Sequence, residues 1–143
     1  MKKWSERTKT GKTAVIAALA IVVAALAAAA LLMFTGDINV TLTENTLRVE
    51  ATYYGGIEVP YSEFDSVTFR EDLDIGRRED GFDSPRLSMG VYENSEFGYY
   101  NLYAYTKAEC YVVLTSGQKT LVLGYADAAQ TRLLYEALLA KIG

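Results

Sequence analysis

A single uncharged stretch constrains this chain more than any other feature. No charged residue occurs from Thr13 to Thr35, and alanine, valine, isoleucine and leucine make up most of the run. Because a helix rises about 1.5 Å per residue, about 20 apolar residues cross the roughly 30 Å hydrocarbon core of a bilayer. We therefore predict one transmembrane helix over residues 13–35, between a basic stub at 1–12 and a folded domain at 37–143. The predicted membrane-anchor residues are Thr13, Ala14, Val15, Ile16, Leu19, Ile21, Val22, Val23, Leu26, Leu31, Leu32, Met33 and Phe34.

A secretory signal peptide would open in the same way, with a charged stub followed by an apolar run. Two features favour an uncleaved signal anchor. The run is longer than the roughly 7–15 residues of a signal-peptide apolar core. It also ends in the bulky residues Leu31, Leu32, Met33 and Phe34, where a cleavage site would need small ones. Cleavage within the Ala27–Ala30 tract is the alternative.

The charges on either side of the helix predict its orientation. Five of the first twelve residues are cationic, whereas Gly36 and Asp37, directly after the helix, add no cation. The positive-inside rule then puts the N-terminus in the cytoplasm and the domain on the outer side of the cell membrane, in a single-pass protein. Ala20, Ala24 and Ala28 have the small-xxx-small spacing of associating helices, which leaves homo-oligomerisation open. A plain anchor is favoured, because the helix is rich in alanine throughout.

Charge and composition exclude several functions for the domain. It holds nine of the fourteen basic residues but seventeen of the eighteen acidic ones. Proteins that bind nucleic acid or anionic lipid headgroups carry basic patches instead. The chain has no histidine, so it lacks the commonest general base and metal ligand, and a Ser-His-Asp triad cannot form. We expect no enzymatic activity, no cofactor and no metal centre.

Beyond Gly36, apolar and polar residues alternate as in half-buried β-strands. Glu44-Asn45 and Ser116-Gly117-Gln118 separate such runs and predict two hairpins, while Pro60 suits an edge strand or a strand end. Residues 71–85 are charged and almost without apolar side chains, and we interpret them as an exposed loop. The predicted strands cover residues 38–43, 47–53, 57–61, 66–70, 86–92, 97–105, 110–114 and 121–123.

The last segment changes to helical spacing. Asp127 occupies a typical N-cap position, and Leu134 and Leu138 recur one helical turn apart. About seven short strands followed by one amphipathic helix predict a mainly β domain. We expect a small barrel or sandwich whose open end is closed by the helix.

Four stretches of the domain resemble the bacterial pleckstrin-homology-like (bacterial PH) domain family, in particular its membrane-anchored members. They are IEVPYSEFDSVTFRED, IGRREDGFDSPRLSMGVYENSEFG, YNLYAYTKAECYVVLTSGQKTLVLG and DAAQTRLLYEALL. The resemblance covers about residues 37–142 and implies a PH-like barrel of about seven strands capped by a C-terminal helix. Eukaryotic relatives of this fold hold phosphoinositides with basic residues on the first hairpin loop. The matching loop here, Thr43–Thr46, has an acid and no cation, so we do not expect phosphoinositide binding.

The acidic residues of the predicted loop are a candidate cation site. Their spacing does not follow the calcium-binding pattern D-x-[DN]-x-[DN]-G, and two arginines neutralise part of their charge, so a solvated loop is the favoured interpretation. These residues are Asp72, Asp74, Glu79, Asp80 and Asp83.

Tyrosines crowd the predicted strand at 97–105. Tyr99, Tyr103 and Tyr105 share one of its faces and are a candidate interaction face, because tyrosine is enriched in binding surfaces. Stabilisation of the sheet by cross-strand aromatic pairs is the favoured alternative. Cys110 alternates with apolar residues and is expected to be a buried thiol. As the single cysteine, it can form no disulfide within the chain.

These observations predict a membrane-tethered, non-enzymatic PH-like module that mediates protein–protein interaction at the membrane surface. A partner segment could add a strand to an unpaired sheet edge or bind the tyrosine face. The alternative is a small-ligand or cation-sensing domain of the cell envelope.

Overall fold

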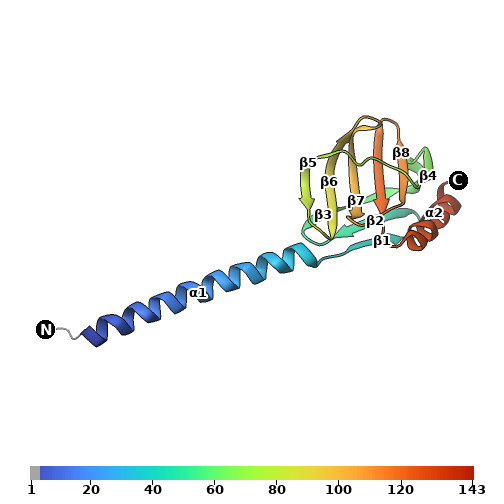
Figure 1. The fold of residues 1–143 in the computed structure, drawn as a ribbon. Helices are drawn as coiled ribbons and strands as arrows, with labels where there is room; N and C mark the ends of the chain where they lie inside the picture. The colour runs from blue at the N-terminus through green and yellow to red at the C-terminus, as the bar shows by residue number, and fades with distance from the viewer. Residues whose placement is uncertain (1–3) are drawn as a thin grey trace. The chain divides into compact units, whose positions relative to one another are not determined.

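The computed structural model describes the backbone of residues 4–143 and the side chains from residue 11 onward. The chain forms two units, the helix α1 (Trp4–Phe34) and a β domain that begins at Thr35 (Figure 1). The part of α1 from Gly11 onward is long and apolar enough to cross a membrane, although a signal sequence near the N-terminus has the same properties. α1 starts before the predicted Thr13. Lys2 and Lys3 of the predicted stub lie outside the described residues.

A three-stranded antiparallel sheet forms the first layer of the domain. In spatial order its strands are β1 (Ile38–Leu42), β2 (Thr46–Ala51) and β3 (Tyr54–Pro60). The β1–β2 hairpin confirms the predicted turn at Glu44-Asn45, with Leu42 opposite Leu47. β3 is an edge strand that ends at Pro60, in agreement with the prediction from proline's missing N–H.

A six-stranded sheet forms the second layer (Figure 1). In spatial order its strands are β4 (Ser66–Arg70), β8 (Tyr111–Ser116), β9 (Lys119–Gly124), β7 (Gly98–Tyr105), β6 (Leu87–Asn94) and β5 (Arg77–Asp83). The predicted turn at Ser116-Gly117-Gln118 joins β8 to β9. β9 then lies between β7 and β8 and runs parallel to β7, with Asn101 opposite Leu121.

The main hydrophobic core lies between the two sheets. α2 (Ala128–Ile142) packs against β4, β8 and the short 3-10 helix η1 (Tyr61–Glu63), and it places the fully buried Leu138 in this core. The predicted cap is confirmed, because the Asp127 side chain accepts a hydrogen bond from the Ala129 N–H at 2.8 Å. A second core covers the outer face of the six-stranded sheet. It is made of Tyr92, Tyr100, Leu102, Ala104, Tyr111, Val113 and Val122.

The structure confirms a mainly β domain with a C-terminal helix, but two sequence-based expectations need correction. The two sheets are not joined into a closed barrel. The segment 71–85 is not a loop throughout, because β5 pairs with β6 along Arg77–Asp83. β5 escaped detection because a mostly exposed edge strand needs no apolar alternation, and charged side chains suit such an edge.

Candidate binding cleft between the sheets

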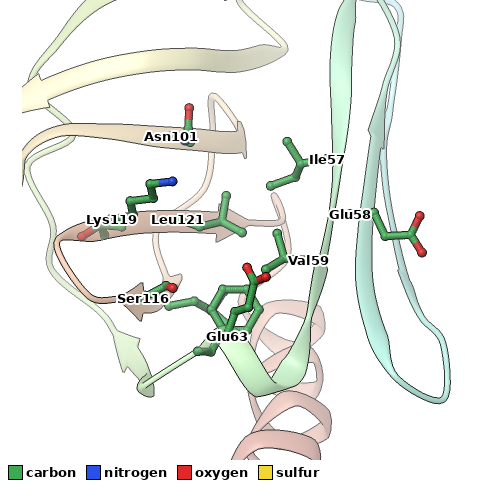
Figure 2. A pocket seen from close by; sticks show the side chains of 11 residues that line it. Ile57, Glu58, Val59, Glu63, Asn101, Ser116, Lys119 and Leu121 are labelled. Atoms are coloured by element: carbon green, nitrogen blue, oxygen red, sulfur yellow. The ribbon is translucent and has the colours of Figure 1, made fainter.

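An open cleft lies between β3 and the six-stranded sheet (Figure 2). Its volume is about 350 Å³. Its floor is apolar and belongs to the main core: Phe64, Leu114 and Leu121 are 9 %, 0 % and 6 % exposed. Ile57 and Val59 of β3 point into the cleft from the other side. This combination of apolar floor and open mouth is typical of ligand and side-chain pockets.

Polar side chains line the mouth of the cleft. Asn101 from β7 and Lys119 from β9 lie on the wall opposite Ile57, whereas Glu63 lies beside Val59 (Figure 2). Lys119 and Glu63 are both exposed, and neither forms an ion pair within the part of the chain that the structure describes. The cleft therefore offers one unpaired cation and one unpaired carboxylate at different levels of its mouth.

Two hydrogen bonds establish which way the backbone groups of β2 point. The Thr43 N–H donates to the Thr46 carbonyl at 2.9 Å, and the Tyr61 N–H donates to the Asn45 carbonyl at 3.0 Å. In an antiparallel ladder, residues whose backbone groups point to one neighbour alternate with residues whose groups point the other way. The even-numbered residues of β2 therefore bond to β1, and the odd-numbered residues bond to β3.

Glu58 lies between two residues that pair with β2. Val59 is opposite Leu47 and Ile57 is opposite Val49, so the backbone groups of Val59 and Ile57 belong to the ladder. The N–H and C=O of Glu58 must then point away from β2. Figure 2 shows the Glu58 side chain turned away from the cleft that this residue lines. Its backbone therefore forms that part of the wall, and neither its N–H nor its C=O has a hydrogen-bond partner among the described residues.

The free part of the β3 edge is short. At one end, the Gly55 carbonyl accepts a hydrogen bond from the Tyr103 hydroxyl at 2.9 Å. At the other end, Pro60 has no N–H to donate. Glu58 therefore carries the donor that is available at the centre of this edge.

The Glu58 side chain belongs to the outer face of the three-stranded sheet. It accepts a hydrogen bond from the Thr46 hydroxyl at 2.9 Å and pairs with Arg48 at 3.4 Å. The Thr46 hydrogen bond, followed by the interactions with Arg48, lowers the pKa of the Glu58 carboxyl. The carboxylate is thus separate from the cleft, and it can be replaced without altering the backbone of the edge.

The other sheet edges are occupied or protected. At β1, the Ile38 N–H donates to the Tyr105 hydroxyl at 3.2 Å. Tyr105 lies beside Tyr125, which lines the same edge together with Val40. The two tyrosine rings stack with centroids 6.1 Å apart. β4 packs beneath α2, and β5 carries Arg and Glu/Asp side chains that discourage strand pairing. The β3 edge differs from all three because it borders an apolar cleft.

A second cleft, of about 380 Å³, lies beside β1. The Tyr105 hydroxyl already accepts a hydrogen bond from the Ile38 N–H at this strand edge. Its charged groups are also paired, because the Arg86 guanidinium contacts the Asp37 carboxylate at 2.6 Å. Among the described residues that line it, this second cleft therefore offers no unpaired charged side chain, unlike the cleft at β3.

Of the three tyrosines predicted to form an interaction face, only Tyr99 is fully open to solvent. Tyr99 is 65 % exposed, whereas Tyr103 is 4 % exposed and lies in the main core. Tyr105 is half-buried, and its hydroxyl contacts Ile38 and Asp37. Burial, the largest contribution, raises the pKa of both Tyr103 and Tyr105. Of these three side chains, the one that is mostly exposed is therefore Tyr99, and it is not among the residues that line the cleft.

Two further sequence predictions concern Cys110 and the acidic residues of 71–85. Cys110 is only partly buried, because it precedes β8 instead of lying within it. The acidic residues of 71–85 are spread along an exposed segment and an edge strand. Among the described residues, no group of three or more acidic or cysteine side chains is placed to hold a metal ion.

In comparisons with known proteins, no family model, curated protein or solved structure matches this chain. The resemblance to bacterial PH domains therefore stays a prediction that rests on the four sequence stretches alone.

Proposed function

We propose that this protein is a membrane-tethered, non-enzymatic β domain that binds a partner protein at the membrane surface. The observation that carries this proposal is the cleft at β3. There an apolar floor meets two charges and a strand edge that have no partner within the described part of the chain. Protein-binding sites commonly combine an apolar centre with a polar rim in this way. The apolar length of α1 supports the tether.

The same proposal includes the orientation and the bacterial PH-like assignment. The cationic residues of the N-terminal stub support a cytoplasmic N-terminus and an extracytoplasmic domain. The mainly β fold with its closing helix supports a PH-like relationship in class and element order. A small apolar ligand is the second candidate occupant, because the volume of the cleft suits one.

Site-specific photo-crosslinking in intact cells tests the proposal. A photoreactive amino acid replaces Asn101, which lies in the cleft wall, or Lys107, an exposed residue in the turn after β7, in the full-length chain. We expect one protein of the cell envelope to be captured from position 101 and not from position 107. Equal capture from both positions, or none, would contradict a protein-binding cleft. Capture of a cytoplasmic protein would contradict the orientation.

A further inference from the structure

We propose that the cleft receives a short extended segment of the partner, which adds a strand to the β3 edge and inserts an apolar side chain between the sheets. This inference rests on the proposed function, since it specifies how the protein partner is held. Its parts are the free backbone groups, the apolar floor and the two unpaired charges.

The backbone of Glu58 provides the directional contacts. Its N–H and C=O point away from β2 and border the cleft. An extended peptide placed beside β3 can accept from the first and donate to the second, as in other complexes formed by strand addition. Gly55, already bonded to Tyr103, and Pro60 limit the pairing to a few residues. The same limits protect the edge from extended pairing between copies of this chain.

The apolar floor selects the side chain that enters. Side chains of an added strand alternate between the two faces of the sheet, so those on the inner face point toward the six-stranded sheet. There they meet Phe64, Leu114 and Leu121, which belong to the main core. A cleft of about 350 Å³ accommodates one or two such side chains and not a folded surface. The occupant is therefore a peptide segment with at least one apolar residue.

The charges at the mouth of the cleft specify which residues should flank the apolar residue of the bound segment. Lys119 lies near the level of Ile57, whereas Glu63 lies beside Val59 (Figure 2). Because neither has an ion-pair partner within the described residues, an acidic residue toward one end of the segment and a basic residue toward the other would complement them. The order of these charges would also set the direction in which the segment runs.

Two substitutions at one position separate the backbone contact from the side chain. Glu58→Pro removes the outward N–H but no ladder bond to β2, and proline is accepted on edge strands at such positions. Glu58→Ala keeps the N–H and removes only the carboxylate, which lies on the outer face. Lys119→Glu, at an exposed residue, reverses the charge at the mouth of the cleft.

The probe is a displayed library of random linear heptapeptides, selected against the full-length chain in lipid nanodiscs, with empty nanodiscs as the subtraction. We expect selected peptides to carry an apolar residue between an acidic and a basic one. They should bind the wild type and Glu58→Ala equally, and bind Glu58→Pro at least about fivefold more weakly, because a peptide carbonyl loses its donor. Lys119→Glu should weaken them about two- to fivefold.

A second measurement needs no change in the protein, should Glu58→Pro unfold. Methylating successive backbone nitrogens of a selected peptide should weaken binding only at alternate positions, since only alternate amides face β3. Uniform effects, equal binding to Glu58→Pro and Glu58→Ala, or no selected peptide would overturn strand addition. So would displacement of the peptides by dodecanoate at concentrations at which dodecanoate itself stabilises the protein, because the cleft would then hold a small amphiphile.

The crosslinking experiment distinguishes this failure from failure of the proposed function. If the probe at position 101 captures the same partner in Glu58→Pro and Glu58→Ala, the protein contact stands and the added strand is wrong. If it captures nothing in the wild type, the proposed function is wrong as well.

Discussion

At the scale of single residues, tyrosine hydroxyls connect the two sheets of this domain. Tyr103 donates to the Gly55 carbonyl of β3, while Tyr105 accepts from the Ile38 N–H of β1. These hydroxyls contact the edges of the three-stranded sheet. In a closed barrel, backbone hydrogen bonds would join such edges to the other sheet. Tyr103 and Tyr105 of β7 therefore help to hold the two sheets together. Sequence alternation identified which tyrosines share a face, but it could not show how deeply each is covered by β1 and β3.

Arg86 has a comparable structural role at the start of the domain. Its Nε donates to the Gly36 carbonyl at 2.7 Å, its Nη2 pairs with Asp37 at 2.6 Å, and its guanidinium lies 5.3 Å from the centre of the Tyr105 ring. We predict that Arg86→Ala lowers the free energy of unfolding by about 1–2 kcal/mol, because a charged hydrogen bond and a cation–π contact are lost together. Urea unfolding in detergent, followed by near-UV circular dichroism of the tyrosines, measures this loss.

Arg70→Ala is the matched control for this prediction. Arg70 also pairs with a carboxylate, that of Glu96 at 2.6 Å, and this pair is no more exposed than the Arg86–Asp37 pair. Its further hydrogen bond, to the Asp72 carbonyl, is local and does not join distant parts of the chain as the Arg86–Gly36 bond does. We expect a loss below about 1 kcal/mol, as is usual for surface ion pairs. Equal losses for the two variants would show that Arg86 contributes no more than a surface charge.

At the scale of elements, β5 shows where local sequence patterns stop being informative. β5 is attached to β6 at a point where two glycines face each other, Gly81 and Gly90, with φ values of +133° and +130°. A Cβ on Gly90 would lie 2.1 Å from the Asp80 carbonyl oxygen. This close approach places a charged segment against the sheet. The sequence of that segment lacks the apolar alternation from which a strand is predicted.

We predict that Gly90→Ala destabilises the protein by about 2–4 kcal/mol, because backbone strain adds to a clash with the Asp80 carbonyl. Trypsin should also cleave faster after Arg77 and Arg78 if β5 separates from β6. Gly98→Ala is the control, because Gly98 also has a positive φ, +69°, but open space around it. Its expected cost is about 1–2 kcal/mol, from strain alone. Similar costs and similar cleavage rates would contradict the role assigned to the glycine pair.

The elements that sequence predicted well have local signals. The hairpin between β1 and β2, the turn between β8 and β9, and the Asp127 cap of α2 each depend on residues close together in the chain. The parallel pairing of β7 with β9 does not depend on residues close together in the chain, because β9 lies in the sheet between β7 and β8, which both precede it in sequence. The cleft depends on that insertion, since it brings Lys119 beside Asn101. Pro60 indicated an edge strand, but the outward direction of Glu58 requires the register of three strands.

At the scale of the whole molecule, the chain combines an apolar helix with an acidic domain that has its own core. Only Thr35–Asp37 lie between α1 and β1, and these residues are hydrogen-bonded to the domain, for example Thr35 to Tyr53 at 2.8 Å. A tether this short gives the domain little reach. We therefore expect the proposed partner to be bound close to the membrane.

Glu58 carries backbone groups that point away from β2, whereas its neighbours Ile57 and Val59 are paired with Val49 and Leu47. Amide hydrogen exchange, measured by NMR on the full-length chain in detergent micelles, tests this directly because ladder amides are protected and free ones are not. We predict that the Glu58 amide exchanges at least about tenfold faster than the amides of Ile57 and Val59 on either side. Equal protection of the three amides would mean that the β3 edge is already satisfied, and it would contradict the binding edge proposed here.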